Sequence, residues 1–239
     1  MWTKKFIVPL KCQGHDPHFR LVTQSTGDCA WLGDLMTNPN YTHVTLVVDR
    51  SGSMSSMRVE AQDGINLLLR EQFMEEGEVS FTVVDFDTEI VEVESMRREA
   101  FEYQLEPRGS TALLDATAHA ILKTGEDLAA LEEDKRPGKV LFVVITDGQE
   151  NASRRFELPA VQEMIARQTN EYRWNFQYIG TEANAWEGAR LGMRTSSHSG
   201  RGKGMSASYK EMNESLKSFR KPDFEEDFFM AEMIADDED

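Results

Sequence analysis

The sequence has few cysteines, no long apolar run and no excess of positive charge. Only Cys12 and Cys29 occur among 239 residues, too few for a disulfide framework, so we expect free thiols and a cytoplasmic protein. The apolar run before Lys11 is only five residues long, too short for a signal-peptide core, and no segment reaches transmembrane length. The net charge of −16 argues against nucleic acid and membrane surfaces as partners, but it does not oppose a divalent cation.

Two kinds of apolar segment alternate from residue 43 onward. Short continuous runs are typical of strands buried on both faces, and apolar residues at helical spacing indicate helices. Strands are expected at 43–49, 79–87, 90–95, 139–146 and 174–180, and helices at 55–75, 111–131, 157–169, 182–193 and 205–219. The alternation predicts a doubly wound, mostly parallel, Rossmann-like α/β sheet with helices on both faces. The turn after residue 87 is too short for a helical crossover, which predicts one antiparallel edge strand.

The chain is expected to have three parts. Residues 1–40 are an irregular N-terminal extension with one short strand at 4–10, residues 41–221 form the α/β domain, and residues 222–239 form an acidic tail. Within the domain, the Ser- and Gly-rich segment 195–204 is expected to be a flexible loop. Trp174 and Phe176 are expected in the core of the sheet.

Oxygen-bearing side chains follow the predicted strands and loops at three places. The set consists of Asp49, Ser51, Ser53, Thr111 and Asp147. In a doubly wound sheet ligands bind outside the carboxyl ends of the strands, so the three loops should meet at one edge. Two carboxylates and three hydroxyls suit Mg²⁺ or Mn²⁺ better than Zn²⁺. Gly52 allows a turn tight enough for the two serine hydroxyls to converge. Neutral ligands leave the ion most of its charge, which favours an anionic ligand from outside.

These motifs resemble those of von Willebrand factor type A domains with a metal-ion-dependent adhesion site. The family pattern of D-x-S-x-S, a distant threonine and a distant aspartate corresponds here to DRSGS (49–53), GSTALLDA (109–116) and TDGQEN (146–151). The resemblance covers roughly residues 43–220. It implies direct ligation of Mg²⁺ (or Mn²⁺, Ca²⁺) by Ser51 and Ser53, and by Thr111 in the ligand-bound form. It also implies that one or both aspartates act through water.

The same resemblance implies what the site does. Its open metal position would bind a Glu or Asp carboxylate of a partner protein, so the chain is expected to be a protein-binding module and not an enzyme. The likeness is greatest to stand-alone intracellular members of the family from bacteria and phages, some of which work beside AAA+ ATPases. The sequence names neither the partner nor the oligomeric state.

Other interpretations stay open at this point. The segment VVDFDTE (83–89) resembles the nucleophile loop of haloacid-dehalogenase-type phosphatases, with Asp85 and Asp87 as the acidic pair, although no lysine-bearing motif follows. The simpler interpretation is a hairpin with these acidic residues at a solvent-facing turn. A further alternative is a structural subunit in which the metal only stabilises the fold.

Two more arrangements are weaker. A serine hydrolase would need His43 or His119 as its base, but SGSMS lacks the G-x-S-x-G elbow, and the histidines fall in a predicted strand and a predicted helix. A zinc site could be drawn from Cys12, His15, His18 and Cys29. Its spacing matches no common structural zinc pattern, and free thiols in an irregular extension are the simpler interpretation.

Overall fold

The structure is a computed structural model that describes residues 37–198 and 203–221. The chain divides into two units, residues 1–36 and 37–239, and everything described here belongs to the second unit. The strand expected at 4–10, the cysteine–histidine set and the acidic tail lie outside the described residues. Within the two described ranges, no helix is long and apolar enough to cross a bilayer.

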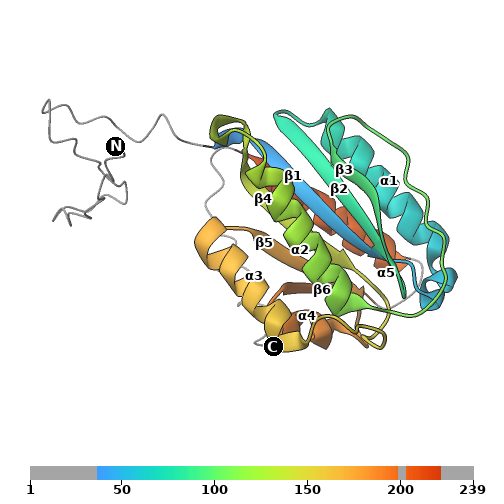
Figure 1. Cartoon of the computed structure of the whole chain (residues 1–239). Helices are drawn as coiled ribbons and strands as arrows, with labels where there is room; N and C mark the ends of the chain where they lie inside the picture. Colours follow the sequence, from blue (N-terminus) through green and yellow to red (C-terminus); the bar gives the residue numbers. More distant parts are fainter. Residues whose placement is uncertain (1–36, 199–202, 222–239) are drawn as a thin grey trace, which may run out of the picture. The chain divides into compact units, whose positions relative to one another are not determined.

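A six-stranded sheet forms the centre of the domain, with the order β3-β2-β1-β4-β5-β6 (Figure 1). The strands are β1 (Asn38–Asp49), β2 (Glu78–Phe86), β3 (Ile90–Arg97), β4 (Pro137–Ile145), β5 (Asn175–Thr181) and β6 (Arg194–His198). Every neighbouring pair is parallel except β2 and β3, which are antiparallel. The predicted doubly wound sheet with one antiparallel edge strand is therefore confirmed.

Helices cover both faces of this sheet (Figure 1). They are α1 (Arg58–Met74), α2 (Leu113–Ala129), α3 (Leu158–Tyr172), α4 (Ala185–Leu191) and α5 (Lys203–Arg220), with short 3-10 helices η2 (Gly52–Ser56) and η3 (Glu133–Lys135). In β1, Val44, Leu46 and Val48 pack in one core with α1 and α5, whereas Val47 packs in a second core with α2 and α3. Because β1 is buried on both faces, its sequence is a continuous apolar run. Trp174 and Phe176 are buried in the second core, as predicted.

The structure differs from the predicted elements at two strands. β1 begins at Asn38, five residues before the expected start of this strand at residue 43. Pro39 is tolerated near the start of the strand, where the pairing with β4 shifts register between Asn38 and Thr42. The expected loop at 195–204 is wrong for residues 195–198, which belong to β6 and pair with β5. That strand is polar because it lies at the edge of the sheet, so its side chains give no apolar signal.

The order of the strands reverses direction between β1 and β4. The chain runs from β1 outward to β2 and β3 on one side, and from β4 outward to β5 and β6 on the other. A doubly wound sheet has its ligand crevice at the carboxyl ends of the two strands that flank this switch point. Asp49 is the last residue of β1, and Asp147 follows the end of β4 by two residues. The fold thus brings both aspartates to the place where such sheets bind ligands.

Candidate metal site

The first loop of the site is organised by the carboxylate of Asp49, which is fully buried. Its Oδ1 accepts a hydrogen bond from the Ser51 backbone N–H at 2.6 Å, and its Oδ2 accepts one from the Thr146 hydroxyl at 2.5 Å. The first bond turns the chain back over the end of β1, and the second joins the ends of β1 and β4. Burial raises the pKa of Asp49 to about 6 despite these hydrogen bonds. A neighbouring cation would offset this cost of burying the charge.

Two serines, Ser51 and Ser53, follow Asp49 in the first loop. The Ser51 and Ser53 hydroxyl oxygens lie 2.9 Å apart, and the Ser53 hydroxyl donates to Asp147 Oδ1 at 2.7 Å. Ser51 is buried, whereas Ser53 is exposed. Burial raises the pKa of Asp147 as well. The Ser53 hydroxyl thus joins the first loop to the carboxylate of Asp147 in the loop that follows β4.

Thr111 comes from the second loop and is buried beside Gly148. A Cβ atom on Gly148 would lie 2.7 Å from Thr111 Oγ1 and 3.1 Å from Asp49 Oδ2. The two oxygen atoms therefore flank this glycine, and a larger residue at position 148 would push against both. This close approach gives a physical reason for glycine directly after Asp147.

The structure thus brings together all five side chains predicted from the sequence, from three loops at one edge of the sheet. Within the described residues, no group of three or more His, Cys, Asp or Glu side chains is placed to hold a metal ion. A metal here would therefore depend on hydroxyl oxygens as well as on Asp49 and Asp147. This donor set consists only of oxygen, and it fits a hard cation such as Mg²⁺.

The third loop, which follows β4, holds Thr111 in place, a role that sequence analysis did not assign. The Thr111 N–H donates to Asn151 Oδ1 at 3.0 Å, and the Thr111 carbonyl accepts from the N–H groups of Asn151 and Ala152 at 3.0 and 3.1 Å. Glu150 accepts hydrogen bonds from the N–H groups of Leu114 and Ala152 at 2.9 Å each. Glu150 and Asn151 lie inside the quoted motif TDGQEN, so their position there was the available signal.

Two further residues, Asn184 and Asp115, form hydrogen bonds to the loop after β4, and neither is one of the five candidate ligands. Asn184 donates from Nδ2 to the Gly148 carbonyl at 2.9 Å, next to Asp147. The buried carboxylate of Asp115 accepts hydrogen bonds from the N–H groups of residues 154–156, at 2.8 to 3.2 Å. Asp115 was visible within GSTALLDA, whereas Asn184 lies 36 residues beyond Gly148 and gave no local signal.

The simpler interpretation of VVDFDTE, a hairpin with Asp85 and Asp87 at a solvent-facing turn, is right about the antiparallel β2–β3 pair and wrong about the exposure of the two aspartates. Asp85 and Asp87 are both buried. Asp85 accepts a hydrogen bond from the Tyr103 hydroxyl at 2.8 Å, and burial raises its pKa to about 6. Asp87 Oδ2 lies 2.9 Å from Arg50 Nε and 2.8 Å from Arg108 Nε. Neither carboxylate is presented as a nucleophile, because both are buried and engaged.

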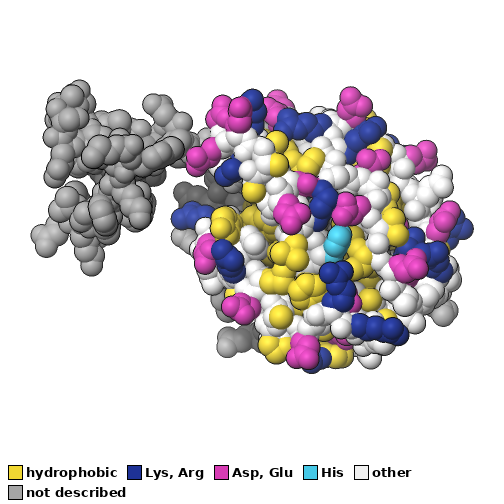
Figure 2. All heavy atoms as spheres, in the orientation of Figure 1, with side chains coloured by type: hydrophobic (Ala, Val, Ile, Leu, Met, Phe, Trp, Pro, Cys, Tyr) yellow, Lys and Arg dark blue, Asp and Glu magenta, His cyan; other side chains and the backbone are white. Residues whose placement is uncertain are grey.

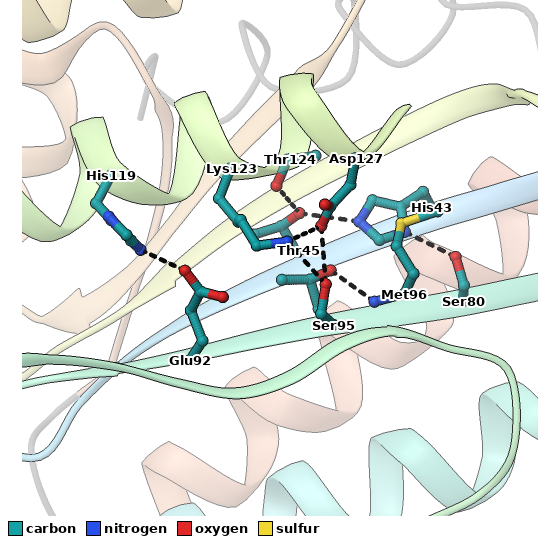
Figure 3. Close-up of polar contacts among 11 residues, drawn as sticks. His43, Thr45, Ser80, Glu92, Ser95, Met96, His119, Lys123, Thr124 and Asp127 are labelled. Carbon is teal, nitrogen blue, oxygen red and sulfur yellow. Dashed lines mark hydrogen bonds and ion pairs between the residues drawn. The ribbon is translucent and has the colours of Figure 1, made fainter. Parts of the chain in front are cut away.

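The two histidines of the hydrolase alternative lie elsewhere, between the sheet and α2 (Figure 3). His43 is buried on β1, with Nδ1 2.7 Å from the Ser80 hydroxyl and Nε2 3.2 Å from the Thr45 hydroxyl. Burial lowers the pKa of His43 to about 3, so it is neutral at physiological pH. His119 on α2 pairs with Glu92 of β3 at 3.0 Å. His119 thus links α2 to β3, whereas His43 forms hydrogen bonds within the sheet, and neither histidine bonds to a serine of the site.

The fold and the site together define a class of protein: a doubly wound α/β domain with a group of oxygen-bearing side chains at the switch point of its sheet. No protein-family model and no curated protein matches the sequence. Solved structures do match. The vWF domain of the type V pili tip protein Mfa5 from Porphyromonas gingivalis is 12% identical over 75% of this chain and 96% of that one, with a TM-score of 0.51.

A second match is proximal thread matrix protein 1 from the mussel byssus. It is 12% identical over 77% of this chain, with a TM-score of 0.52. This chain spans only 46% of the mussel chain, less than half of its length. At these identities the likeness concerns the backbone alone. The chain therefore has the fold of a von Willebrand factor type A domain.

Proposed function

We propose that this chain is a metal-dependent protein-binding module. Asp49, Ser51, Ser53, Thr111 and Asp147 would hold one Mg²⁺, or Mn²⁺ or Ca²⁺ in its place. The position left open would bind a Glu or Asp carboxylate from a partner protein. The observation that supports this most directly is the convergence of five oxygen-bearing side chains from three loops at the switch point of the sheet: Thr111 and Asp49 flank Gly148, and Ser51, Ser53 and Asp147 are linked by their side chains.

The roles of the residues follow from their environments. Ser51 and Ser53 offer hydroxyl oxygens 2.9 Å apart, and Thr111 offers a third beside Asp49. Mg²⁺ takes six ligands, so three hydroxyls and two aspartates acting largely through water leave room for an incoming carboxylate. The carboxylates of Asp49, which is buried, and Asp147, which is partly buried, supply negative charge that balances the ion in part. When bound, the ion supplies a nearly unneutralised positive charge, which explains why an acidic residue of the partner would dominate affinity.

A binding role fits the site better than catalysis. Neither His43 nor His119 forms a hydrogen bond with the five side chains, and the carboxylates of Asp85 and Asp87 are engaged in other bonds. We therefore expect no phosphatase or hydrolase turnover. Phosphatase activity that is lost in Asp85→Asn would contradict this. On the face that Figure 2 shows, acidic and basic side chains are interspersed, which gives no support to nucleic acid or a membrane as the partner.

The proposal is tested by calorimetric titration of Mg²⁺ and Mn²⁺, paired with pull-downs with and without chelator. Wild type should bind one ion, and chelation should release the acidic partner, for which an AAA+ ATPase is one candidate suggested by the family resemblance. Asp49→Ala should abolish both without unfolding the domain. The matched control is Asp134→Ala. Asp134 is exposed and lies in η3, at the amino end of β4 and thus at the end of the strands opposite to the site, so this variant should bind the ion and the partner as wild type does. If wild type binds neither ion at millimolar concentration, or keeps every partner after chelation, the proposal is wrong.

A further inference from the structure

A buried group of charged residues lies beside the metal-site loops, centred on Asp87 in the turn between β2 and β3. Its carboxylate Oδ2 is 2.9 Å from Arg50 Nε and 2.8 Å from Arg108 Nε. Arg50 is also buried, whereas the side chain of Arg108 is 56% exposed and pairs in addition with Glu89 at 2.7 Å. One carboxylate thus joins two arginines from two different loops.

Each of these arginines is placed next to predicted metal ligands. Arg50 lies between Asp49 and Ser51 in the first loop, and Arg108 precedes Thr111 by three residues in the second loop. Asp87 therefore contacts both of the loops that would supply hydroxyl ligands, although its own side chain is not among the five predicted to hold the metal.

Backbone hydrogen bonds fasten the same two loops together. The Arg108 N–H donates to the Arg50 carbonyl at 2.6 Å, and the Gly52 N–H donates to the Gly109 carbonyl at 3.1 Å. The Ala112 N–H, directly after Thr111, donates to the carbonyl of Asp87 at 3.0 Å. The spacing between the serine hydroxyls and Thr111 therefore depends on the segment that carries Asp87.

The second loop passes so close to the β2–β3 turn that only glycine fits there. Gly109 has φ of +68°, and a Cβ on it would lie 2.9 Å from Thr88 Oγ1 and 3.2 Å from Asp87 Cβ. The next residue, Ser110, donates its N–H to Thr88 Oγ1 at 3.0 Å. The turn thus supports the Thr111 loop by direct contact as well as through the arginines.

The charges of this group explain why Asp87 cannot be removed without consequence. Burial raises the pKa of Asp87, but the hydrogen bond from the Glu89 N–H and the two guanidinium groups outweigh it, so its pKa is below the ordinary value. Arg50 contacts it as an ion pair without hydrogen-bond alignment, and its buried Nη2 has no hydrogen-bond partner among the described residues. Loss of the Asp87 charge would remove the ion-pair partner of the buried Arg50 and leave it only the electrostatic attraction of Asp85, which favours movement of the first loop.

We propose that Asp87 is a positioning residue of the metal site, which acts through Arg50 and Arg108 to hold the Asp49–Ser53 loop and the Thr111 loop at the spacing that one ion needs. This inference rests on the proposed function. It gives Asp87 a supporting role in metal binding, in place of the catalytic role that the phosphatase alternative would give it together with Asp85.

The test is Mn²⁺ titration of full-length wild type, Asp87→Asn and a matched control, Asp127→Asn. Asp127 forms a partly buried ion pair with Lys123 on α2, with no metal-site loop involved. Asp87→Asn should weaken Mn²⁺ binding roughly 10- to 100-fold, the loss typical of residues that support metal ligands. Asp127→Asn should bind as wild type does. The water-proton relaxation of bound Mn²⁺, which reports its water ligands, should change in Asp87→Asn and not in the control.

A double-mutant cycle with Ser53→Ala separates positioning from a merely structural role. If Asp87 acts by holding the two loops, Ser53→Ala should weaken Mn²⁺ binding less in the Asp87→Asn background than in wild type. Should Asp87→Asn fail to fold, the ion pair between Asp87 and the more exposed Arg108 is tested instead through Arg108→Gln. This variant should have a lower Mn²⁺ affinity and a thermal stability close to that of wild type.

The outcomes are distinguishable. Wild type that binds no Mn²⁺ would contradict the proposed function itself. Wild type that binds Mn²⁺, with equal affinity and equal relaxation in Asp87→Asn or in Arg108→Gln, would overturn this inference and leave the proposed function standing.

Discussion

Three aspartates near the carboxyl ends of β1 and β2 are all buried, yet their surroundings differ. Asp49 and Asp85 accept hydrogen bonds from neutral groups, and burial raises the pKa of each to about 6. Asp87 contacts two arginines, and its pKa is lowered. The first two are therefore ionised at neutral pH at a cost to stability, whereas Asp87 is held in its charged form.

The raised pKa of Asp85 predicts how stability depends on pH. Its pKa is about 6 in the folded chain and 3.8 ordinarily, so the folded state favours the protonated form. That contribution is fully present below pH 4 and is lost as pH rises through 6, with a total of about 3 kcal/mol. Asp85→Asn should therefore be progressively more stable than wild type between pH 4 and pH 6, with a plateau above.

Denaturant unfolding at several pH values, in the presence of chelator, measures this difference. The exposed Asp134→Asn serves as the control for the replacement of a carboxylate by an amide. A constant gap between Asp85→Asn and wild type across pH 4 to 8 would show that burial does not control the ionisation of Asp85.

Two glycine-to-alanine variants separate an effect on metal binding from an effect on folding, because only Gly148 lies against the candidate ligands Thr111 and Asp49. Gly148→Ala would bring a methyl group within 2.7 Å of Thr111 Oγ1, so Mn²⁺ affinity should fall at least tenfold. Gly125→Ala, within α2, has no atom within 4 Å of the new methyl group and should stabilise the fold by about 1 kcal/mol with unchanged affinity. Titration and denaturant unfolding of both variants provide the measurements. Normal Mn²⁺ binding by Gly148→Ala would place the ion away from Thr111.

Among the elements, α5 depends on a buried arginine at its end. Arg220 donates to the carbonyls of Gln72, Glu76 and Gly77, where α1 ends and the chain enters β2. Arg220→Ala would leave these carbonyls without their charged donor, so the free energy of unfolding should fall by about 2–3 kcal/mol. Because this contact lies at the amino ends of the strands, metal affinity should not change.

Denaturant unfolding of Arg220→Ala tests this role for α5. The control on the same helix is Lys210→Ala, whose side chain is exposed and whose loss should matter by less than about 0.5 kcal/mol. Equal stability of the two variants would mean that α5 is held by its apolar face alone.

The same elements show which parts of the fold could be predicted from the sequence. β1 and β4 were recognisable because strands buried on both faces need continuous apolar runs. β6 was missed because an edge strand of Thr, Ser and His residues is ordered by backbone pairing with β5, which no side-chain pattern reveals. The five candidate ligands were recognisable because each stands in a local motif. The bracing role of Asn184 and the loop contacts of Asp87 arise only from tertiary packing, so no sequence spacing predicts them.

At the scale of the whole molecule, the acidic tail is the main charge outside the described residues. Residues 222–239 contain nine acidic residues and no basic ones, and Phe224, Phe228 and Ala231 recur at helical spacing. We expect this segment to bind a partner or a second copy of the chain. Deletion of 222–239 should weaken association, measured by sedimentation and pull-down, while the thermal midpoint stays unchanged. Unaltered association would indicate a segment that only solvates the chain.

The long sequence separation of the site has a consequence for folding. The Ser53–Asp147 hydrogen bond joins residues 94 positions apart, and the Thr146–Asp49 bond joins residues 97 apart. The unfolded chain therefore has no preformed site, and an ion that binds only the native state shifts the folding equilibrium by mass action. At a free concentration one hundred times its Kd, the ion would add about 2.7 kcal/mol to the free energy of unfolding. Metal supply would thus influence the fraction of the chain that is folded as well as its readiness to bind.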